Sequence, residues 1–432
     1  MLIDMQKNIT FPFLFFFISI VIFSGFKTKA DKYFLFSNAY DKALSNSNII
    51  KKNEFLLNSK TNLISNAYSN KDWNLDFTSS LTLDNKKSDN IGDYVDQKTT
   101  VNTISLDKTL IDFGFTDKSV EIALNNKKIA SNNLLLAKQN LFINTLSSYL
   151  NVYNSNKILD LRVSNVNRFK TAVKAAKLKL SAGTITPTTV SEAEARLARS
   201  EYELATSKTE QINYVNEFKS LIGEDFNLKK MNLPEFKYSL PKTIKEAESL
   251  ALNSNLNILN ITLAKKNAEL LKAKQLASSY PSLDLDFYLK NSESDSNSSV
   301  NDYSSYGTIL TFKSSLLRNK SESSLILSLD NNYKSILEEQ NELIRVSKLN
   351  TLSLFNKYIN SDFNVIAANK EYNASKLALN GVKKEEEFGL RTLLDVLDIE
   401  VDLMNSEVRL LKSKSDQLLN KYKLLIDIGK YN

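Results

Sequence analysis

The chain has 432 residues, 9 glycines, 5 prolines and a formal net charge of +7. It contains neither cysteine nor histidine, which excludes a disulfide framework, a Cys/His zinc site, a thiol nucleophile, a Ser-His-Asp triad and a lipid anchor on cysteine. The charge is modest for this length and no dense basic block accompanies it, so we expect no nucleic-acid partner.

The first residues have the order of a secretory signal. Lys7 precedes an apolar run over residues 11–23, and a more polar stretch with Ala30 follows. The run is shorter than the ~20 residues that span a bilayer as a helix, although an uncleaved anchor is the alternative. No later segment is apolar enough for a membrane helix. We therefore predict a signal peptide over 1–30, export of the mature chain, and membrane insertion only as β-structure.

Residues 31–226 are predicted to form a first structural unit. The apolar pattern over 39–69 indicates a helix, and alternation over 73–83 and 101–112 indicates two strands. Gly114 ends the second strand. No glycine or proline follows until residue 183, which predicts one helix of about 65 residues, or about 100 Å at 1.5 Å per residue. A turn at 182–189 leads into a second helix that ends at Gly223.

Residues 227–242, which include Pro234 and Pro241, are predicted to be a connector. The same order of elements then returns over residues 243–432. A helix is followed by predicted strands at 282–290 and 303–314, a second very long helix, a turn at 381–392 bracketed by Gly381 and Gly389, and a final helix.

The two units align without a gap. Gly183 and Gly389 lie 206 positions apart, as do Gly223 and Gly429. The same offset pairs polar residues: Thr186 with Thr392, Glu194 with Glu400, and Gln211 with Gln417. It also pairs apolar residues that recur every seven positions: Val190, Leu197 and Leu204 with Val396, Leu403 and Leu410. Such a heptad repeat predicts that each helix packs against a partner helix. We infer a duplicated segment.

Four alternating strands cannot close a barrel, and an open sheet edge in lipid leaves backbone groups unpaired. Either the strands form a small soluble sheet, or several chains combine them. Three copies would supply about twelve strands, enough for a barrel with a lumen. The helices are too long to be buried against one domain, and side by side around the same axis they would continue the barrel as a tunnel.

Three stretches resemble the TolC-like outer membrane factors of Gram-negative bacteria. They are ISLDKTLIDFGFTDKSVEIA, AGTITPTTVSEAEARL and FGLRTLLDVLDIEVDLMNSEV, and the motif G-x-R-T-x-x-D-V-L-D at residues 389–398 is the most specific. The resemblance implies an α+β membrane protein: a homotrimer whose 12-stranded β-barrel, four strands per chain, continues as a periplasmic α-helical barrel.

The resemblance also implies the function and the partners. The chain would be a passive export channel with no cofactor and no enzymatic activity, in contact with outer-membrane lipid, a periplasmic adaptor protein and an inner-membrane pump of RND or ABC type. Efflux of small molecules and type I protein secretion both stay open. The alternative from a different class is a periplasmic coiled-coil scaffold or adhesin without a pore, which would not explain the paired strands.

The resemblance places a gate at the second turn. Its arginine falls on Arg391, and its two acidic rings fall on Asp395 and Asp398. Positions i and i+3 share a helix face, so a trimer would present six carboxylates that could bind a blocking cation. The alternative is that acids in a first helical turn merely favour the helix dipole.

Two positions depart from the family. Thr189 stands where the family has a latching aspartate, and Glu386 stands where it has a gate tyrosine. Glu386 or Glu387 is then the expected partner of Arg391, unless the gate is looser. The predicted adaptor-docking turns comprise Gly183, Thr184, Gly389, Leu390 and Thr392. Lysines near both turns, such as Lys170, Lys177 and Lys383, are either part of that docking surface or a solvated helix face.

Overall fold

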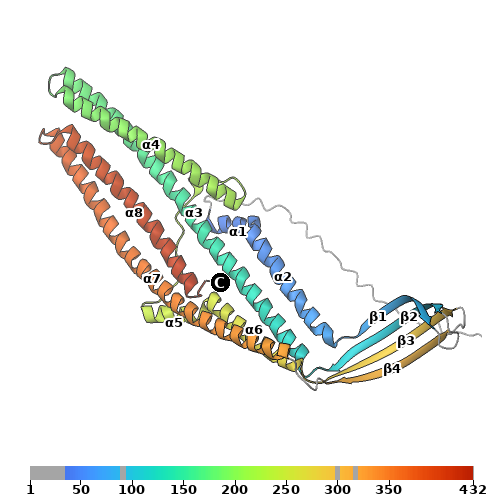
Figure 1. Ribbon diagram of the computed structural model, residues 1–432. Helices are drawn as coiled ribbons and strands as arrows, with labels where there is room; N and C mark the ends of the chain where they lie inside the picture. Colours follow the sequence, from blue (N-terminus) through green and yellow to red (C-terminus); the bar gives the residue numbers. More distant parts are fainter. Residues whose placement is uncertain (1–34, 88–93, 297–301, 315–319, 432) are drawn as a thin grey trace, which may run out of the picture.

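The computed structural model describes residues 35–87, 94–296, 302–314 and 320–431. The predicted signal peptide, residues 1–30, lies outside them. Figure 1 shows an elongated molecule with a β-sheet at one end and long helical hairpins that reach to the other end. Among the described helices, none combines the length and the apolar character that crossing a membrane requires.

The four strands form one antiparallel sheet in the order β1-β2-β3-β4. Their bounds are Asn74–Lys87, Tyr94–Ile111, Ser282–Ser296 and Tyr303–Lys313. The two strand pairs of the sequence are joined because β2 pairs with β3, with Leu106 opposite Phe287. β1 and β3 continue past the predicted ends at 83 and 290, and β2 starts before residue 101. The strands are longer than predicted because their pairing continues through polar residues such as Asp84 and Gln97. A pattern of alternating apolar residues does not reveal strand segments that are polar on both faces.

The two faces of the sheet differ in chemistry and in exposure. The apolar face is open: Leu75, Phe77, Leu83 and Phe312 are between 68% and 72% exposed. The opposite face is polar, and even the small side chains of Ser292 and Ser294 on it are buried. Burial on the polar face is limited to the inner part of the sheet, because Asp76, Thr78 and Ser80 of β1 on the same face are exposed.

Each repeat begins with a broken helix. Residues 39–69 were predicted as one helix, which is wrong: α1 (Phe36–Asn46) and α2 (Asn48–Tyr68) are separate, and a short 3-10 helix, η1 (Ser69–Lys71), follows. The Ser47 side chain accepts a hydrogen bond from the Ile50 backbone and so starts a new helix. In the second repeat, Asn255 caps α6 (Leu256–Ala277) after α5 (Ile244–Ser254) in the same way.

The long helices are continuous. α3 spans Phe115–Ser181 with 67 residues, and α7 spans Lys320–Glu387 with 68 residues. Each returns through a shorter partner, α4 (Pro187–Ile222) or α8 (Leu393–Asp427). Between α4 and α5 lies a connector whose regular element is a short 3-10 helix, η2 (Leu228–Lys230).

The second turn starts later in the chain than the predicted range 381–392. Gly381 lies inside α7, and the chain leaves the helix only after Glu387. One glycine within a helix costs about 1 kcal/mol relative to alanine, and helix bonds on both sides of Gly381 outweigh that cost. Gly389 is the residue that turns the chain, with a φ of 73°.

Equivalent side chains of the two repeats make equivalent contacts. Lys177 pairs with Glu194 at 2.8 Å in the first hairpin, and the residues 206 positions later, Lys383 and Glu400, pair at 2.9 Å. The amide of Gln211 donates to Asn156 at 3.0 Å, and that of Gln417 donates to Asp362 at 2.7 Å. These matched contacts support the duplication.

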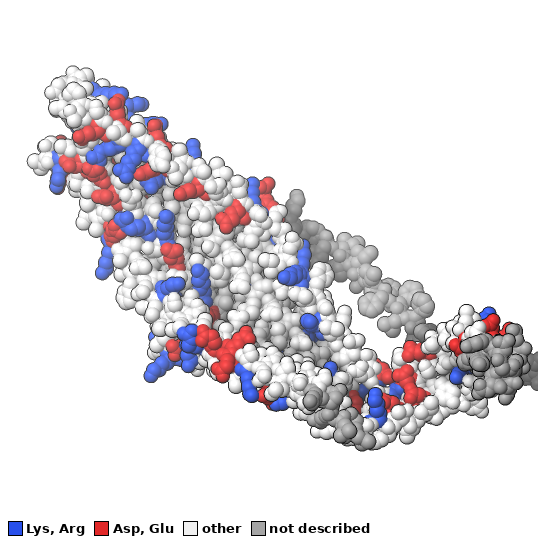
Figure 2. Space-filling view, viewed as in Figure 1, with Lys and Arg blue, Asp and Glu red and all other residues white. Residues whose placement is uncertain are grey.

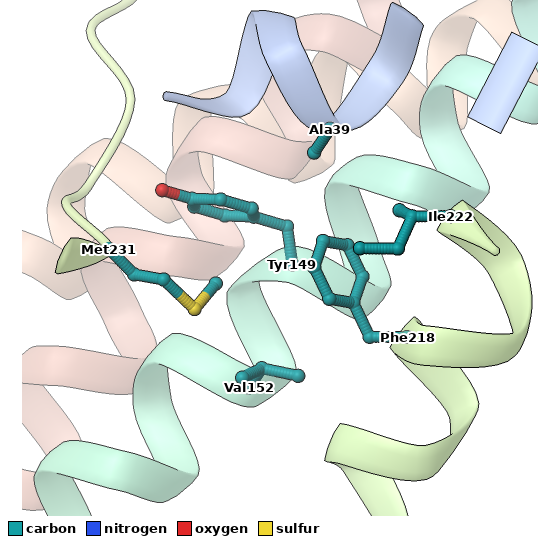
Figure 3. Close-up of a cluster of buried hydrophobic side chains, with 6 residues drawn as sticks. All are labelled: Ala39, Tyr149, Val152, Phe218, Ile222 and Met231. Carbon is teal, nitrogen blue, oxygen red and sulfur yellow. The ribbon is translucent and has the colours of Figure 1, made fainter. Parts of the chain in front are cut away.

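The core lies midway along the molecule, where both repeats meet. Figure 3 shows one of its clusters, in which Tyr149 and Val152 of α3 pack against Phe218 and Ile222 of α4, Ala39 of α1 and Met231 of the connector. A neighbouring cluster around Phe142 joins α3 to α8, and the ring of Tyr431 near the C-terminus lies 4.4 Å from the Phe142 ring. The sheet and the hairpins project from this core in opposite directions (Figure 1).

Candidate functional site

Both helical hairpins turn at the end of the molecule farthest from the sheet (Figure 1). Gly183 and Gly389 adopt φ values of 72° and 73°, which glycine adopts without strain. The next residue donates a backbone bond five positions back: Thr184 to Lys179 at 2.9 Å, and Leu390 to Glu385 at 2.8 Å. These bonds close the long helices, and the predicted docking glycines therefore have a structural role in the turns.

Asp395 is engaged at the start of α8. Thr392 caps this helix: its hydroxyl accepts the Asp395 backbone N–H at 3.1 Å, while the Asp395 carboxylate accepts the Thr392 backbone N–H at 2.8 Å. The carboxylate also accepts the Thr392 hydroxyl at 2.8 Å. The bonds that the Thr392 backbone and hydroxyl donate lower the pKa of Asp395, and the charges of Arg391 and Arg196 add to the effect. Asp395 is therefore a charged helix cap within its own chain.

Thr189 is the equivalent of Asp395 in the first repeat. Its backbone N–H donates to the Thr186 hydroxyl at 3.4 Å, and the two hydroxyls lie 3.2 Å apart. The first cap is thus neutral, and only the second repeat places a carboxylate at this position.

Asp398 joins the two hairpins. The guanidinium of Arg196 on α4 binds both of its carboxylate oxygens, through Nη1 and, at 3.2 Å, through Nη2. The Asp398 side chain remains 57% exposed. Sequence reasoning did not identify Arg196, because no helical spacing relates it to a residue 202 positions away.

A second ion pair joins the hairpins at the turns. Lys179 at the end of α3 donates to Glu386 of α7 at 2.8 Å. The expectation that Arg391 pairs with Glu386 or Glu387 is wrong, since its Nε donates to Glu385 at 3.0 Å. The backbone hydrogen bond from Leu390 to Glu385 folds the chain so that Arg391 lies beside Glu385. The Glu386 carboxylate is instead bound by Lys179.

Apolar contacts accompany these two ion pairs. Phe169 and Ala172 of α3 pack against Leu397 of α8 in a buried cluster. Leu393 and Leu394 of α8 also pack against the apolar cluster of the first hairpin tip. The tips of the two hairpins are therefore held together by two apolar clusters and two ion pairs.

Most of the lysines near the turns are paired with carboxylates, although Lys174 and Lys384 are exposed. Lys170 pairs with Glu201 at 3.3 Å, and Lys177, Lys179 and Lys383 have the carboxylate partners given above. Figure 2 shows blue and red side chains interleaved over this half of the molecule. These ion pairs favour the interpretation of the lysines as a solvated helix face over their interpretation as a basic docking surface.

Exposed apolar side chains gather instead at the second turn. Phe388 and Leu390, on either side of Gly389, are 80% and 75% exposed. Their equivalents in the first turn, Ala182 and Thr184, are small. Leu390 is among the predicted docking residues. Phe388 is not, because an apolar residue at a helix end has no distinctive spacing in the sequence.

Within the described residues, no three acidic side chains come together as a metal site would require. Asp395 and Asp398 are both engaged in hydrogen bonds inside the chain. A cation site at these residues would therefore need carboxylates from further copies.

Residues 39–224 match the family described as outer membrane efflux protein. The outer membrane efflux protein BepC of Brucella suis biovar 1 (strain 1330) is 25% identical over 291 residues, which are 66% of this chain and 62% of BepC. The match thus spans less than two thirds of that relative.

Solved structures share the fold over a larger part of the chain. CusC, which forms a transmembrane channel, has a TM-score of 0.79 at 14% identity, and the match covers 91% of this chain and 92% of CusC. The Campylobacter jejuni CmeC outer membrane channel has a TM-score of 0.76 at 15% identity, over 91% of this chain and 85% of its own.

Proposed function

We propose that this chain is a TolC-like outer membrane factor and that three copies form a passive duct from a periplasmic pump and adaptor assembly to the cell exterior. The match of residues 39–224 to the outer membrane efflux protein family, the likeness to BepC and the shared fold of CusC support this proposal. The family resides in the outer membrane and extends into the periplasm. It is a channel family and not an enzyme family, and we propose the same for this chain.

The observation that carries this proposal is the division of the sheet into two faces. Large apolar side chains such as Leu75, Phe77 and Phe312 gather on one face and are exposed in the single chain, while the opposite face is mainly polar. β1 and β4 are edge strands within the described sheet, and in lipid such edges must pair. Three sheets joined edge to edge would place the apolar face against lipid and the polar face around a lumen of about twelve strands.

The helices would extend this lumen. At 1.5 Å per residue, α3 and α7 are each about 100 Å long. They start next to the sheet and end at the hairpin turns (Figure 1). The end of the sheet away from the helices would then face the exterior, and the turns would lie deep in the periplasm.

We propose that the hairpin tips form the gate. The Arg196–Asp398 and Lys179–Glu386 pairs, with the apolar contact around Leu397, would hold the closed state. Arg391 would stiffen the second turn through Glu385, and Thr189 would serve only as the backbone donor to the Thr186 cap of α4. In a trimer, the exposed Asp398 and the charged cap Asp395 would contribute to the acidic rings that could bind a blocking cation.

We propose that the turns dock the adaptor, with Phe388 and Leu390 as the main apolar contacts and Gly183, Thr184, Gly389 and Thr392 shaping the turns. The pump would be of RND or ABC type. BepC is named an efflux protein, which favours efflux of small molecules over protein secretion.

The test uses the full-length chain. Outer-membrane fractions extracted in detergent should yield trimers that dissociate on heating, and the trimers should conduct ions in planar bilayers. A monomer in the soluble periplasmic fraction would contradict the proposal and favour the scaffold or adhesin.

A further inference from the structure

Gly307 and Tyr288 form a close contact within the sheet. Gly307 lies in edge strand β4, directly opposite Tyr288 of β3. A Cβ atom at Gly307 would lie 2.8 Å from the Tyr288 hydroxyl oxygen and 2.9 Å from two carbons of its ring. Glycine in a strand interior often marks a position where another group approaches the backbone closely. Here the tyrosine ring occupies the space that any other side chain would need.

This contact lies on the polar face of the sheet. Side chains alternate along β3, so Tyr288 shares a face with Asp286, Lys290 and the buried Ser292. Tyr288 itself is half-buried. In the proposed duct this face surrounds the lumen, and the ring is folded against the wall instead of standing out from it.

A side chain at position 307 would force the ring to move. The atoms that a Cβ would meet are the far end of the Tyr288 side chain, which can swing to another rotamer without rearranging the backbone. The open space for that movement is on the polar face. In a trimer, three rings would enter the lumen at one level.

We propose that Gly307 is a recess that holds Tyr288 against the wall, and that this recess sets the free width of the duct for bulky solutes. The inference rests on the proposed function, because only a closed assembly gives the polar face a lumen. Gly307 is a positioning residue that acts through Tyr288.

The test uses the absence of cysteine from the chain. Thr311→Cys adds a single thiol to the same face of β4, opposite Asp284 and closer to the helices than Gly307. A reagent that arrives from outside the cell must pass the level of Tyr288 to reach it. Intact cells are treated with a small membrane-impermeant maleimide or with one that carries a polyethylene glycol chain, and the two labelling rates are compared.

In the Thr311→Cys parent we expect labelling by both reagents. Adding Gly307→Val should slow the polymer reagent relative to the small one, and Gly307→Ala should have a smaller effect in the same direction. Adding Tyr288→Ala to Gly307→Val should restore the parental ratio. Ser305→Val, which adds the same side chain on the same face opposite Lys290, is the matched control and should leave the ratio unchanged.

An unchanged ratio with Gly307→Val in assembled trimers would overturn the recess, as would a slowed polymer reagent that Tyr288→Ala does not restore. A Thr311→Cys parent that neither reagent labels from outside would overturn the proposed duct, and the recess with it. If Gly307→Val does not assemble, the Gly307→Ala variant and its Tyr288→Ala partner decide the question.

Discussion

Arg196 of the first hairpin binds both carboxylate oxygens of Asp398 in the second hairpin. The two residues come from different repeats, and their equivalents 206 positions away, Asp402 and Glu192, are both acidic and cannot form the same pair. The ion pair therefore has no counterpart at the equivalent positions of the two repeats. It lies at the hairpin tips, where the proposed gate must open.

Removing the Arg196–Asp398 pair should favour the open state. An exposed ion pair contributes up to about 1 kcal/mol, so Arg196→Ala should raise the open-to-closed ratio by a factor of up to about five per chain. Single-channel recording in planar bilayers measures this ratio. Arg199→Ala is the control, because Arg199 pairs with Glu203 on its own helix. Equal open probability in wild type and Arg196→Ala would exclude this pair from the latch.

Neutralising the tip acids should weaken block by divalent cations. Asp395→Asn with Asp398→Asn removes six charges from a trimer, and asparagine keeps an oxygen for the helix cap at position 395. The measurement is the concentration of a divalent cation that halves the bilayer conductance, which should rise. Asp402→Asn on the same helix is the control. If the double variant is blocked as strongly as wild type, these residues do not form the cation site.

Asp427 should make stability depend on pH. It lies at the end of α8, and burial raises its pKa despite hydrogen bonds from Thr351 and Asn350. Since its folded-state pKa lies above the ordinary value of 3.8, its favourable contribution is complete below that value and is lost as the pH rises through the folded pKa. At neutral pH the charged carboxylate of Asp427 therefore destabilises the folded state.

Asp427→Asn should consequently raise the Tm of the detergent-solubilised protein at neutral pH, and the gain should shrink as the pH falls toward 4. Thermal unfolding at both pH values measures this. Asp416→Asn, at an exposed position of the same helix, should show no such pH-dependent gain. A Tm lower than that of wild type at neutral pH would show that the hydrogen bonds to the carboxylate outweigh its burial.

Phe388 and Leu390 should carry most of the adaptor contact. Burying one such side chain contributes roughly 1.5–3 kcal/mol, so Phe388→Ser or Leu390→Ser should reduce adaptor affinity by about tenfold or more. Co-purification of periplasmic adaptor proteins with the tagged full-length chain measures the loss. Ala182→Ser and Thr184→Ser alter the equivalent positions of the first turn and should have little effect. The docking assignment is wrong if both pairs of variants behave alike.

The sequence by itself determined the features that depend on nearby residues. The absence of glycine and proline predicted the two long helices, and alternation predicted the four strands, because these patterns act within one element. The 206-residue offset predicted the repeat, and the structure shows its Lys177–Glu194 and Lys383–Glu400 pairs. The motif at 389–398 indicated the family, which the comparisons support.

Only the tertiary structure decided which distant residues meet. The rotation of each helix about its axis brings Arg196 to Asp398 and Lys179 to Glu386, and no spacing within a helix encodes that rotation. The pairing of β2 with β3 joins the two repeats into one sheet, and its register extends the strands through polar residues. Tyr288 meets Gly307 only because β3 and β4 pair in one particular register. Such contacts depend on the packing of whole elements, so the chain order alone could not show them.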